Sequence, residues 1–279
     1  MYRVTMNAYP QEDLSVIEEK ASPYGVHEGE TPTPEDIPHV TFLGEAFREG
    51  AGLWTREQGF LQSLEEDRWK YLLMENREGY ALTEDIFIQP VTSSYITRQH
   101  YRHVVYIDPN HAFGDGRHPT TLLCMEFLVE RITPLSEVER ERLVVMDVGA
   151  GTGILSILAM KLGAGTVEAV EISESALASA RENAGTNRCE EIRFRQGDIA
   201  CLEGSKCYDI VLANLISDVI IPNLASLCRL VRPGGVMVMS GVSRVRAPEV
   251  QRHLAESPLR LLDRRERDGW CGYLLLLPD

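Results

Sequence analysis

The chain has 279 residues, 44% of them hydrophobic and 25% charged, which is enough for one large or two medium domains with well-formed cores. Its formal net charge of −14 disfavours a direct nucleic-acid partner, because an acidic surface repels phosphate backbones. The sequence contains no run of 18 or more apolar residues and no secretory signal at its start, so we expect a cytoplasmic protein without a membrane partner.

The acidity is concentrated in the N-terminal third. Residues 1–90 contain 18 Asp and Glu against 7 Lys and Arg, a net charge of −11, which leaves −3 for residues 91–279. A segment of this charge favours a basic partner through long-range attraction. The alternative is an acidic surface that only improves solubility.

The six cysteines are scattered along the chain and form no C-x-x-C pair. The short ligand spacings that are typical of zinc sites and redox pairs are therefore missing. We expect reduced, mostly buried thiols and no bound metal.

The first 80 residues predict a small α+β domain. Apolar spacing and alternation predict two strands, at 2–9 and 39–43, and two helices, at 11–22 and 56–75. Prolines and glycines between 23 and 38 interrupt the pattern. Residues 81–110 are expected to form a strand-rich connector, with apolar runs at 86–88 and 103–107.

From residue 143 onward, strands alternate with helices. The expected strands are 143–148, 166–172, 192–194, 208–212, 236–240, 259–264 and 271–277, and the expected helices are 154–162, 175–183 and 223–230. Such alternation favours a doubly wound parallel sheet. Because only a charged turn separates the last two strands, we expect them to form a hairpin that gives the sheet an antiparallel edge. Residues 111–279 are thus predicted to be a Rossmann-like α/β domain with a mostly parallel seven-stranded sheet.

A glycine-rich turn follows the first strand of this domain. It reads D-V-G-A-G-T-G over 147–153, between a buried strand and a helix. Glycines there let the backbone pass close beneath a ligand, so Gly149, Gly151 and Gly153 are candidate cofactor-binding residues. Ile154 occupies the last glycine position of the dinucleotide fingerprint, and the tighter turn suits a ligand without a pyrophosphate. A structural turn without a ligand is the alternative.

Two acidic residues follow the next two strands. Glu171 stands 22 residues after Gly149, at a position where a carboxylate accepts hydrogen bonds from both ribose hydroxyls. Asp198 comes 27 residues later and is placed to accept a hydrogen bond from an adenine amino group, with Ile199 against the ring. The alternative for Glu171 is a solvated acid at the end of a strand, and the alternative for Asp198 is an ordinary loop acid. The turn and the two acids in this order predict an adenosine site.

Two segments extend this pattern to a known family. The turn at 147–153, Glu171 and the A-N-L-I segment at 213–216 together resemble class I S-adenosylmethionine-dependent methyltransferases. Residues 108–121, D-P-N-H-A-F-G-D-G-R-H-P-T-T, are similar to the A-F-G-T-G-x-H-P-T-T signature of the ribosomal protein L11 lysine methyltransferases. The resemblance runs from about Val104 to the end of the chain. Lysine methyltransferases of the electron-transfer flavoprotein share part of this signature.

The resemblance implies S-adenosyl-L-methionine as the cofactor. It implies that Thr121, Gly149, Glu171 and Asn214 contact the cofactor. Phe113 is expected to lie beside the methionine portion. Asp115 replaces the usual threonine of the F-G-T-G turn, and a glutamate replaces the more common aspartate at position 171. Residues 1–80 match the substrate-recognition domain of the family only as a suggestive strand–helix–strand pattern.

Methyl transfer from a sulfonium is a direct displacement that needs a neutral amine in line with the methyl group, so positioning carries most of the catalysis. A nearby sulfonium and partial desolvation lower the pKa of a lysine amine. Asn214 and Phe113 are the expected catalytic residues, with the amide oxygen of Asn214 accepting from the amine. The alternative is an asparagine that only holds the cofactor or the turn. For His118 we favour a structural role over that of a base.

These features predict a protein-lysine N-methyltransferase that acts on ribosomal protein L11 or a similar basic protein, recognised by residues 1–80. The alternatives are a methyltransferase for another protein or a small molecule, and a scaffold that binds the cofactor without catalysis. An NAD-dependent oxidoreductase is disfavoured by Ile154.

Overall fold

The computed structural model describes residues 3–7, 27–28, 39–43, 79–91, 101–108, 112–199, 202 and 208–279. Its contacts divide the chain into two units, Met1–Arg77 and Glu78–Asp279, and each is considered by itself. The helices that the sequence predicts over 11–22 and 56–75 lie outside the described residues.

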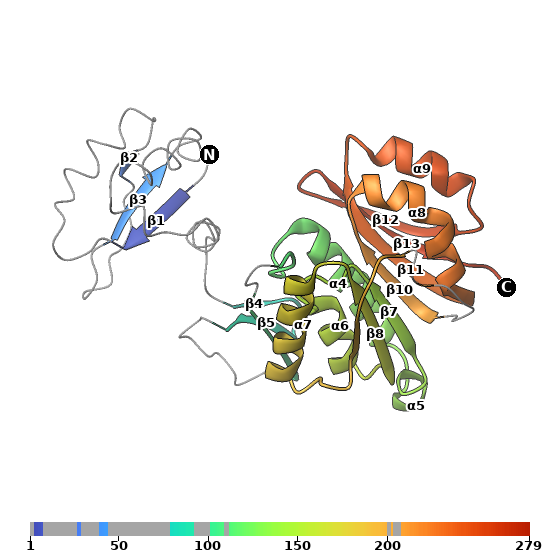
Figure 1. The fold of residues 1–279 in the computed structure, drawn as a ribbon, viewed down its shortest axis with the longest axis horizontal. Helices are drawn as coiled ribbons and strands as arrows, with labels where there is room; N and C mark the ends of the chain where they lie inside the picture. Colours follow the sequence, from blue (N-terminus) through green and yellow to red (C-terminus); the bar gives the residue numbers. More distant parts are fainter. Residues whose placement is uncertain are drawn as a thin grey trace. The chain divides into compact units, whose positions relative to one another are not determined.

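The first unit contains a three-stranded antiparallel sheet in the order β1-β3-β2 (Figure 1). Its strands are β1 (Arg3–Asn7), β2 (His27–Glu28) and β3 (His39–Leu43). β1 and β3 pair along their whole lengths, from Arg3 opposite Leu43 to Asn7 opposite His39. The sequence predicted both of these strands, whereas β2 is too short to show alternation.

The second unit is built around a seven-stranded sheet in the order β12-β13-β11-β10-β7-β8-β9 (Figure 1). The strands are β7 (Val144–Val148), β8 (Thr166–Glu171), β9 (Arg193–Gln196), β10 (Tyr208–Asn214), β11 (Val231–Ser243), β12 (Arg260–Arg267) and β13 (Trp270–Leu276). Neighbours from β11 to β9 are parallel, and β13 is antiparallel to both β11 and β12. This arrangement confirms the predicted Rossmann-like sheet with its terminal antiparallel hairpin.

Helices cover both faces of this sheet (Figure 1). One face carries α4 (Pro119–Ile132), α6 (Ile154–Lys161) and α7 (Glu174–Thr186), and the other carries α8 (Ser217–Leu230) and α9 (Ala247–Ala255). Side chains of successive strand residues point to opposite faces of the sheet, and each face has its own hydrophobic core. Val145 therefore packs with α4 and α6, while Met146 packs with α8 and α9. Burial on both faces explains why these strands are almost continuously apolar. No helix in the described part of the chain is both long and apolar enough to cross a membrane.

Three helices depart from the sequence-based expectation. α8 begins at Ser217 rather than at residue 223 and contains Pro222, because burial of Ile220 and Leu224 outweighs the proline's missing hydrogen bond. The short α5 (Glu137–Arg140) and α9 were not predicted. α5 has a capping box, a sequence signal that apolar spacing does not reveal.

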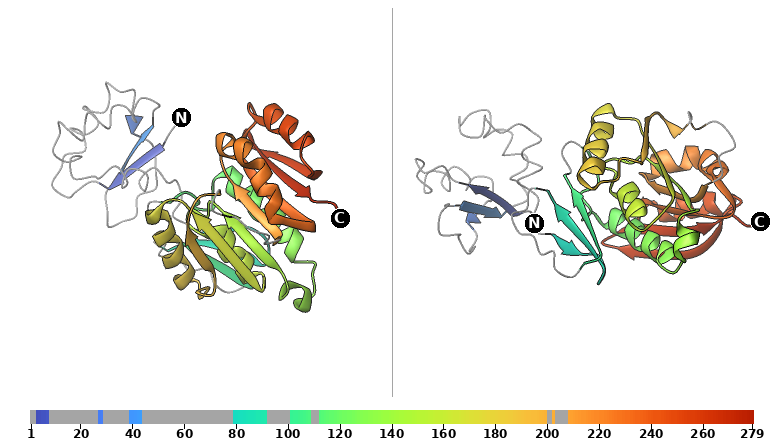
Figure 2. Two further views of the ribbon diagram at one scale, coloured as in Figure 1. Left: turned by 45° about the vertical axis from the view of Figure 1, so that its right-hand side comes forward. Right: turned by 90° about the horizontal axis from the view of Figure 1, so that it is seen from below.

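A second, three-stranded sheet lies beside α6 and α7 (Figure 2). It consists of β4 (Tyr80–Ala81), β5 (Ile86–Pro90) and β6 (His103–Ile107), with β5 parallel to β6. Two buried asparagines, Asn183 on α7 and Asn187 at its C-terminal cap, bind the backbone at the end of β6. Asn187 pairs with both the N–H and the C=O of Tyr106, at 2.8 and 2.6 Å, and Asn183 does the same with Asp108, at 2.8 and 2.9 Å. These bonds anchor the chain just before the segment that begins at residue 112.

Candidate functional site

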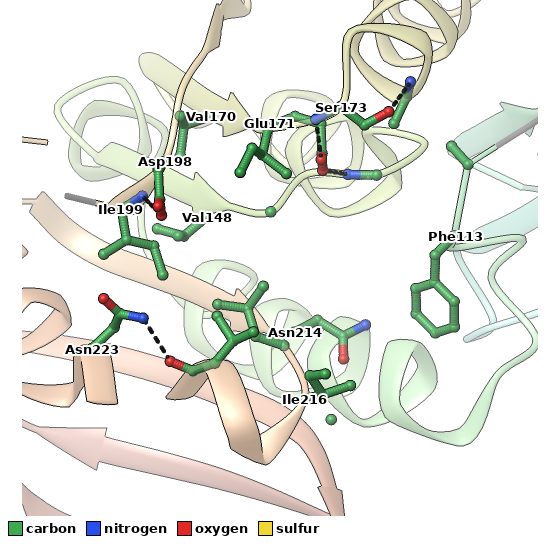
Figure 3. Close-up of a pocket in the computed structure, with 18 of the residues that line it drawn as sticks. Phe113, Val148, Val170, Glu171, Ser173, Asp198, Ile199, Asn214, Ile216 and Asn223 are labelled. Atoms are coloured by element: carbon green, nitrogen blue, oxygen red, sulfur yellow. Dashed lines mark hydrogen bonds between the residues drawn. The ribbon is translucent and has the colours of Figure 1, made fainter. Parts of the chain in front are cut away.

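A cavity of about 690 Å³ opens at the C-terminal ends of β7, β8, β9 and β10 (Figure 3). These parallel strands all point to one edge of the sheet, and the loops that leave them line the cavity. β10 returns to the opposite side of β7 from β8, so the cavity lies where the strand order reverses. Open α/β sheets bind their ligands at such a point.

Most of the residues predicted for the site line this cavity. They are Phe113, Gly149, Gly151, Glu171, Asp198 and Asn214. Thr121 and Gly153 lie behind the cavity wall. Thr121 is bonded to Asn214, and a Cβ on Gly153 would lie 3.2 Å from Cβ of Ala180 on α7.

The glycine turn is held against the segment before α4. Gly151 has a φ of +55°, and a Cβ built on it would lie only 2.3 Å from the carbonyl oxygen of Phe113. The next residue, Thr152, donates its N–H to that same oxygen at 3.0 Å and its hydroxyl to the carbonyl of Gly114 at 2.6 Å. Gly151 is therefore required for close packing between two backbone segments, rather than only for passage of a ligand.

The aspartate that departs from the family signature has a local role. Oδ1 of Asp115 accepts from the N–H of Arg117 at 2.9 Å, a turn that a threonine hydroxyl also supports. The hydroxyl of Tyr80 on β4 donates to the carbonyl of Gly116 at 2.5 Å. Asp115 and Tyr80 thus both stabilise the loop that leads into α4.

Glu171 bridges the glycine turn and the start of α7 (Figure 3). Glu171, at the end of β8, is 9% exposed. Oε2 accepts from the N–H of Gly151 at 2.9 Å and Oε1 from the N–H of Ser173 at 3.0 Å. Each carboxylate oxygen has a second lone pair, so the group retains acceptor capacity toward the cavity.

Asn214 presents an unpartnered oxygen at the end of β10. Its Nδ2 donates to the hydroxyl of Thr121 at 3.2 Å, which fixes the orientation of the amide. Its Oδ1 is buried and has no hydrogen-bond partner among the described residues. A buried acceptor without a partner is costly, so this atom indicates where a ligand donor binds.

Three aromatic rings form one end of the cavity wall. The ring of His118 lies edge-on to Phe113 at 5.1 Å and to Trp270 at 5.0 Å between centroids. Nδ1 of His118 accepts from the N–H of Thr120 and so caps α4, and burial lowers the pKa of its imidazole. These contacts favour the structural role for His118. Trp270 was not predicted as a site residue, because only the β12–β13 hairpin brings it to the cavity.

The opposite end of the cavity carries two polar side chains (Figure 3). Oδ1 of Asp198 accepts from the N–H of Ile199 at 2.5 Å. Asn223 on α8 also lines the cavity and was not predicted, because the sequence placed it at the start of a helix rather than in its second turn. Ile199, Val148 and Val170 form apolar walls between them.

Asp147 is a fully buried acid directly before the glycine turn. Its Oδ2 accepts from both the N–H and the hydroxyl of Ser156, at 3.1 and 2.6 Å. Burial, assisted by the nearby carboxylate of Glu171, raises the pKa of Asp147 to about 6. The raised pKa means that the ionised form of Asp147 destabilises the folded state relative to the unfolded state.

We expect the stability of the ligand-free protein to reflect this ionisation. The folded-state pKa of Asp147 lies above its unfolded value, so its contribution is complete below about pH 4 and is lost as the pH rises through 6. Relative to Asp147→Asn, the wild type should lose roughly 2 to 3 kcal/mol of unfolding free energy between pH 4 and pH 8. Urea unfolding of both proteins across this range measures the difference, and a constant difference would contradict the assignment.

The described residues contain no cluster of three or more His, Cys, Asp or Glu side chains that fits a metal ion. Cys124, Cys189, Cys228 and Cys271 are buried free thiols, and burial raises the pKa of Cys228 to about 11. The other two cysteines lie outside the described residues.

The strand order, the glycine turn and the cavity at the reversal point define a Rossmann-like α/β protein of the nucleotide-binding class. A family model described as ribosomal protein L11 methyltransferase (PrmA) matches residues 42–275. Given the extent of this match, the chain belongs to the ribosomal protein L11 methyltransferase family.

Individual relatives agree with this placement. The ribosomal protein L11 methyltransferase of Dictyoglomus thermophilum is 38% identical over 167 residues, which are 60% of this chain and 52% of that protein. That of Symbiobacterium thermophilum is 34% identical over 226 residues, 81% of this chain and 68% of the relative. The chain thus spans only about half the length of the Dictyoglomus relative.

A solved structure shows the same fold. The ribosomal protein L11 methylase of Lactobacillus delbrueckii subsp. bulgaricus superimposes with a TM-score of 0.63 at 27% identity. The superposition covers 71% of this chain and 97% of that one.

Proposed function

We propose that the protein is a cytoplasmic methyltransferase that transfers methyl groups from S-adenosylmethionine to lysine amines of ribosomal protein L11 or a similar basic protein. Family membership favours this substrate over a small molecule or the electron-transfer flavoprotein. The observation that carries the proposal is the buried, unpartnered Oδ1 of Asn214 at the cavity, because a buried acceptor without a partner is costly unless a bound molecule supplies the donor.

The residues of the cavity fit the cofactor. Glu171 retains acceptor capacity for ribose hydroxyls, and Asp198 offers an acceptor for an adenine amino group, with Ile199 against the ring. Gly149 and Gly151 line the same cavity, so the backbone of the glycine turn itself lies against the ligand. We infer that these groups hold the adenosyl portion, with Thr121 and Gly153 supporting them from behind.

Bound S-adenosylmethionine supplies an activated methyl group on a positively charged sulfur. The protein's own part is to bring a neutral amine to it. Oδ1 of Asn214 accepts a hydrogen bond from the amine and fixes its direction, while Phe113 and Trp270 exclude water from the amine. Desolvation on entering the site lowers the pKa of the lysine, so the amine gives its proton to solvent before it is shielded from water, and no dedicated base is needed.

Glu171→Ala should weaken binding of S-adenosylhomocysteine by about 1.5–3 kcal/mol, because hydrogen bonds to a charged group are lost. Calorimetry measures the change. The 2′,3′-dideoxy analogue should bind wild type and variant about equally, apart from any loosening of the turn at Gly151. If the variant still discriminates fully against the analogue, Glu171 does not contact the ribose.

We further propose that the acidic residues 1–80 recognise the basic substrate, with 81–110 as a connector to the catalytic domain over 111–279. The kcat/KM for the protein substrate should then fall as salt rises, because charges are screened beyond about 10 Å at 0.1 M. Neutralising Glu65, Glu66 and Asp67 together should raise the KM for the protein substrate and leave cofactor affinity unchanged. A flat salt profile and an unaltered KM would mean that the acidity serves solubility alone.

A further inference from the structure

Asp218 is an acidic side chain that lines the cavity and that the proposed cofactor contacts do not use. It lies in the first turn of α8, shortly after Asn214, and its side chain is 72% exposed. We propose that Asp218 is a specificity-determining residue that receives the charged ammonium group of the substrate lysine at the mouth of the cavity. This inference rests on the proposed function, since it concerns the substrate of that reaction.

The ion pair of Asp218 places it away from the residues proposed to hold the adenosyl portion. Its Oδ1 lies 2.9 Å from Nη2 of Arg246, which comes just after β11. In the sheet, β11 lies on the opposite side of β10 from β8 and β9. Glu171 ends β8, and Asp198 follows β9. Asp218 is therefore drawn toward the side of β10 that these two acids do not occupy.

Two exposed apolar side chains line the cavity together with this acid. Ile216, at the N-cap of α8, is 61% exposed, and Phe113 is 56% exposed. Phe113 lies on the Asn214 side of the cavity, across from Asp198 (Figure 3). A lysine side chain has an apolar stem and a charged end, so it fits a cavity wall that combines apolar side chains with one exposed carboxylate.

The carboxylate can bind an ammonium without giving up its ion pair. A carboxylate has about four acceptor positions on its two oxygens, and the contact with Arg246 is made through Oδ1. Arg246 is also paired with Glu249 on α9, with Nε 2.8 Å from Oε2. The guanidinium is thus held from two sides and need not leave when a lysine arrives.

Asp218 and Asn214 suit the two protonation states of the amine in turn. A carboxylate in contact with water favours the charged ammonium. The buried amide oxygen of Asn214 is neutral and accepts a hydrogen bond from the uncharged amine. The ammonium therefore binds first at Asp218, loses its proton to water, and moves as the amine to Asn214.

The other interpretation of Asp218 is structural. An aspartate in the first turn of a helix interacts favourably with the helix dipole, and its pair with Arg246 joins the starts of α8 and α9. In that case substitution changes the stability of the protein and leaves the KM for the substrate unaltered. Separate values of KM and kcat therefore distinguish the two interpretations.

The test uses the full chain, ribosomal protein L11 and saturating S-adenosylmethionine. Asp218→Asn should raise the KM for L11 by about fivefold, the effect of losing one exposed ion pair, and leave kcat and the affinity for S-adenosylhomocysteine unchanged. Raising the salt concentration should shrink the difference from wild type, because an exposed charge is screened. Asp218→Glu keeps the charge and should restore most of the KM.

Glu249→Gln is the matched control. It removes the other carboxylate that binds Arg246, but Glu249 does not line the cavity. This variant should have the KM of the wild type.

An unchanged KM in Asp218→Asn would overturn the inference, as would a loss confined to kcat or an equal rise of KM in Glu249→Gln. Each of these results would leave the proposed function intact, because the wild type still methylates L11. A wild type that binds S-adenosylhomocysteine and does not methylate L11 would instead refute the proposed substrate, and this inference with it.

Discussion

Gly151→Ala is expected to lower the affinity for S-adenosylhomocysteine by up to about 100-fold, because a side chain at this position strains the turn by about 1–3 kcal/mol and displaces it from its binding conformation. The new Cβ would lie 2.3 Å from the carbonyl oxygen of Phe113, and φ at this position is +55°. The backbone must therefore move, and Thr152 would lose its bonds to Phe113 and Gly114. Calorimetry measures the affinity, and circular dichroism shows whether the fold persists.

Gly185→Ala provides the matched control. Gly185 lies within α7 and has no positive φ, and a Cβ added to it would meet nothing within 4 Å. Alanine there should bind the ligand as the wild type does and stabilise the helix by roughly 0.5–1 kcal/mol. If Gly151→Ala binds as well as this control, the turn does not need its close approach to Phe113.

Asn214→Ala is expected to reduce kcat/KM for the protein substrate by about 100-fold, with most of the loss in kcat. The reason is the loss of the buried Oδ1, which we assign to the incoming amine. Affinity for S-adenosylhomocysteine should fall much less than kcat. Steady-state kinetics and calorimetry on the same preparation separate the two effects.

Variants of Thr121 supply the control for Asn214. Thr121→Ser keeps the hydroxyl that orients the amide and should remain close to the wild type, whereas Thr121→Val loses that 3.2 Å bond and should lower kcat partially. If Asn214→Ala loses cofactor affinity in proportion to kcat, its role is to hold the cofactor, the alternative that the sequence left open.

The fold was predictable where burial is strong and repetitive. Strands such as β7 and β10 are buried on both faces, so each appears in the sequence as an apolar run of the right length. Local rules failed where tertiary packing opposed them. The sequence placed the start of this helix at residue 223, after Pro222, but the buried face of α8 carries the helix through the proline, from Ser217 to Leu230.

The candidate site was predictable in its residue types and less so in its contacts. The spacing of Glu171 from the glycine turn predicted that it lies at the cavity, but not that it binds the N–H of Gly151. The contact of Gly151 with Phe113 joins residues far apart in the chain, so no spacing rule reveals it. Trp270 and Asn223 reach the cavity only through the hairpin and the true start of α8.

The central claim is methyl transfer from S-adenosylmethionine to a lysine of a basic ribosomal protein. Its most direct test is incubation of the full chain with isotopically labelled cofactor and purified ribosomal protein L11, followed by mass spectrometry of the product. Wild type and Gly185→Ala should add methyl groups to lysine side chains, and Gly151→Ala should add far fewer at the same cofactor concentration. Absence of label on L11 from a wild type that binds S-adenosylhomocysteine would contradict the proposed substrate.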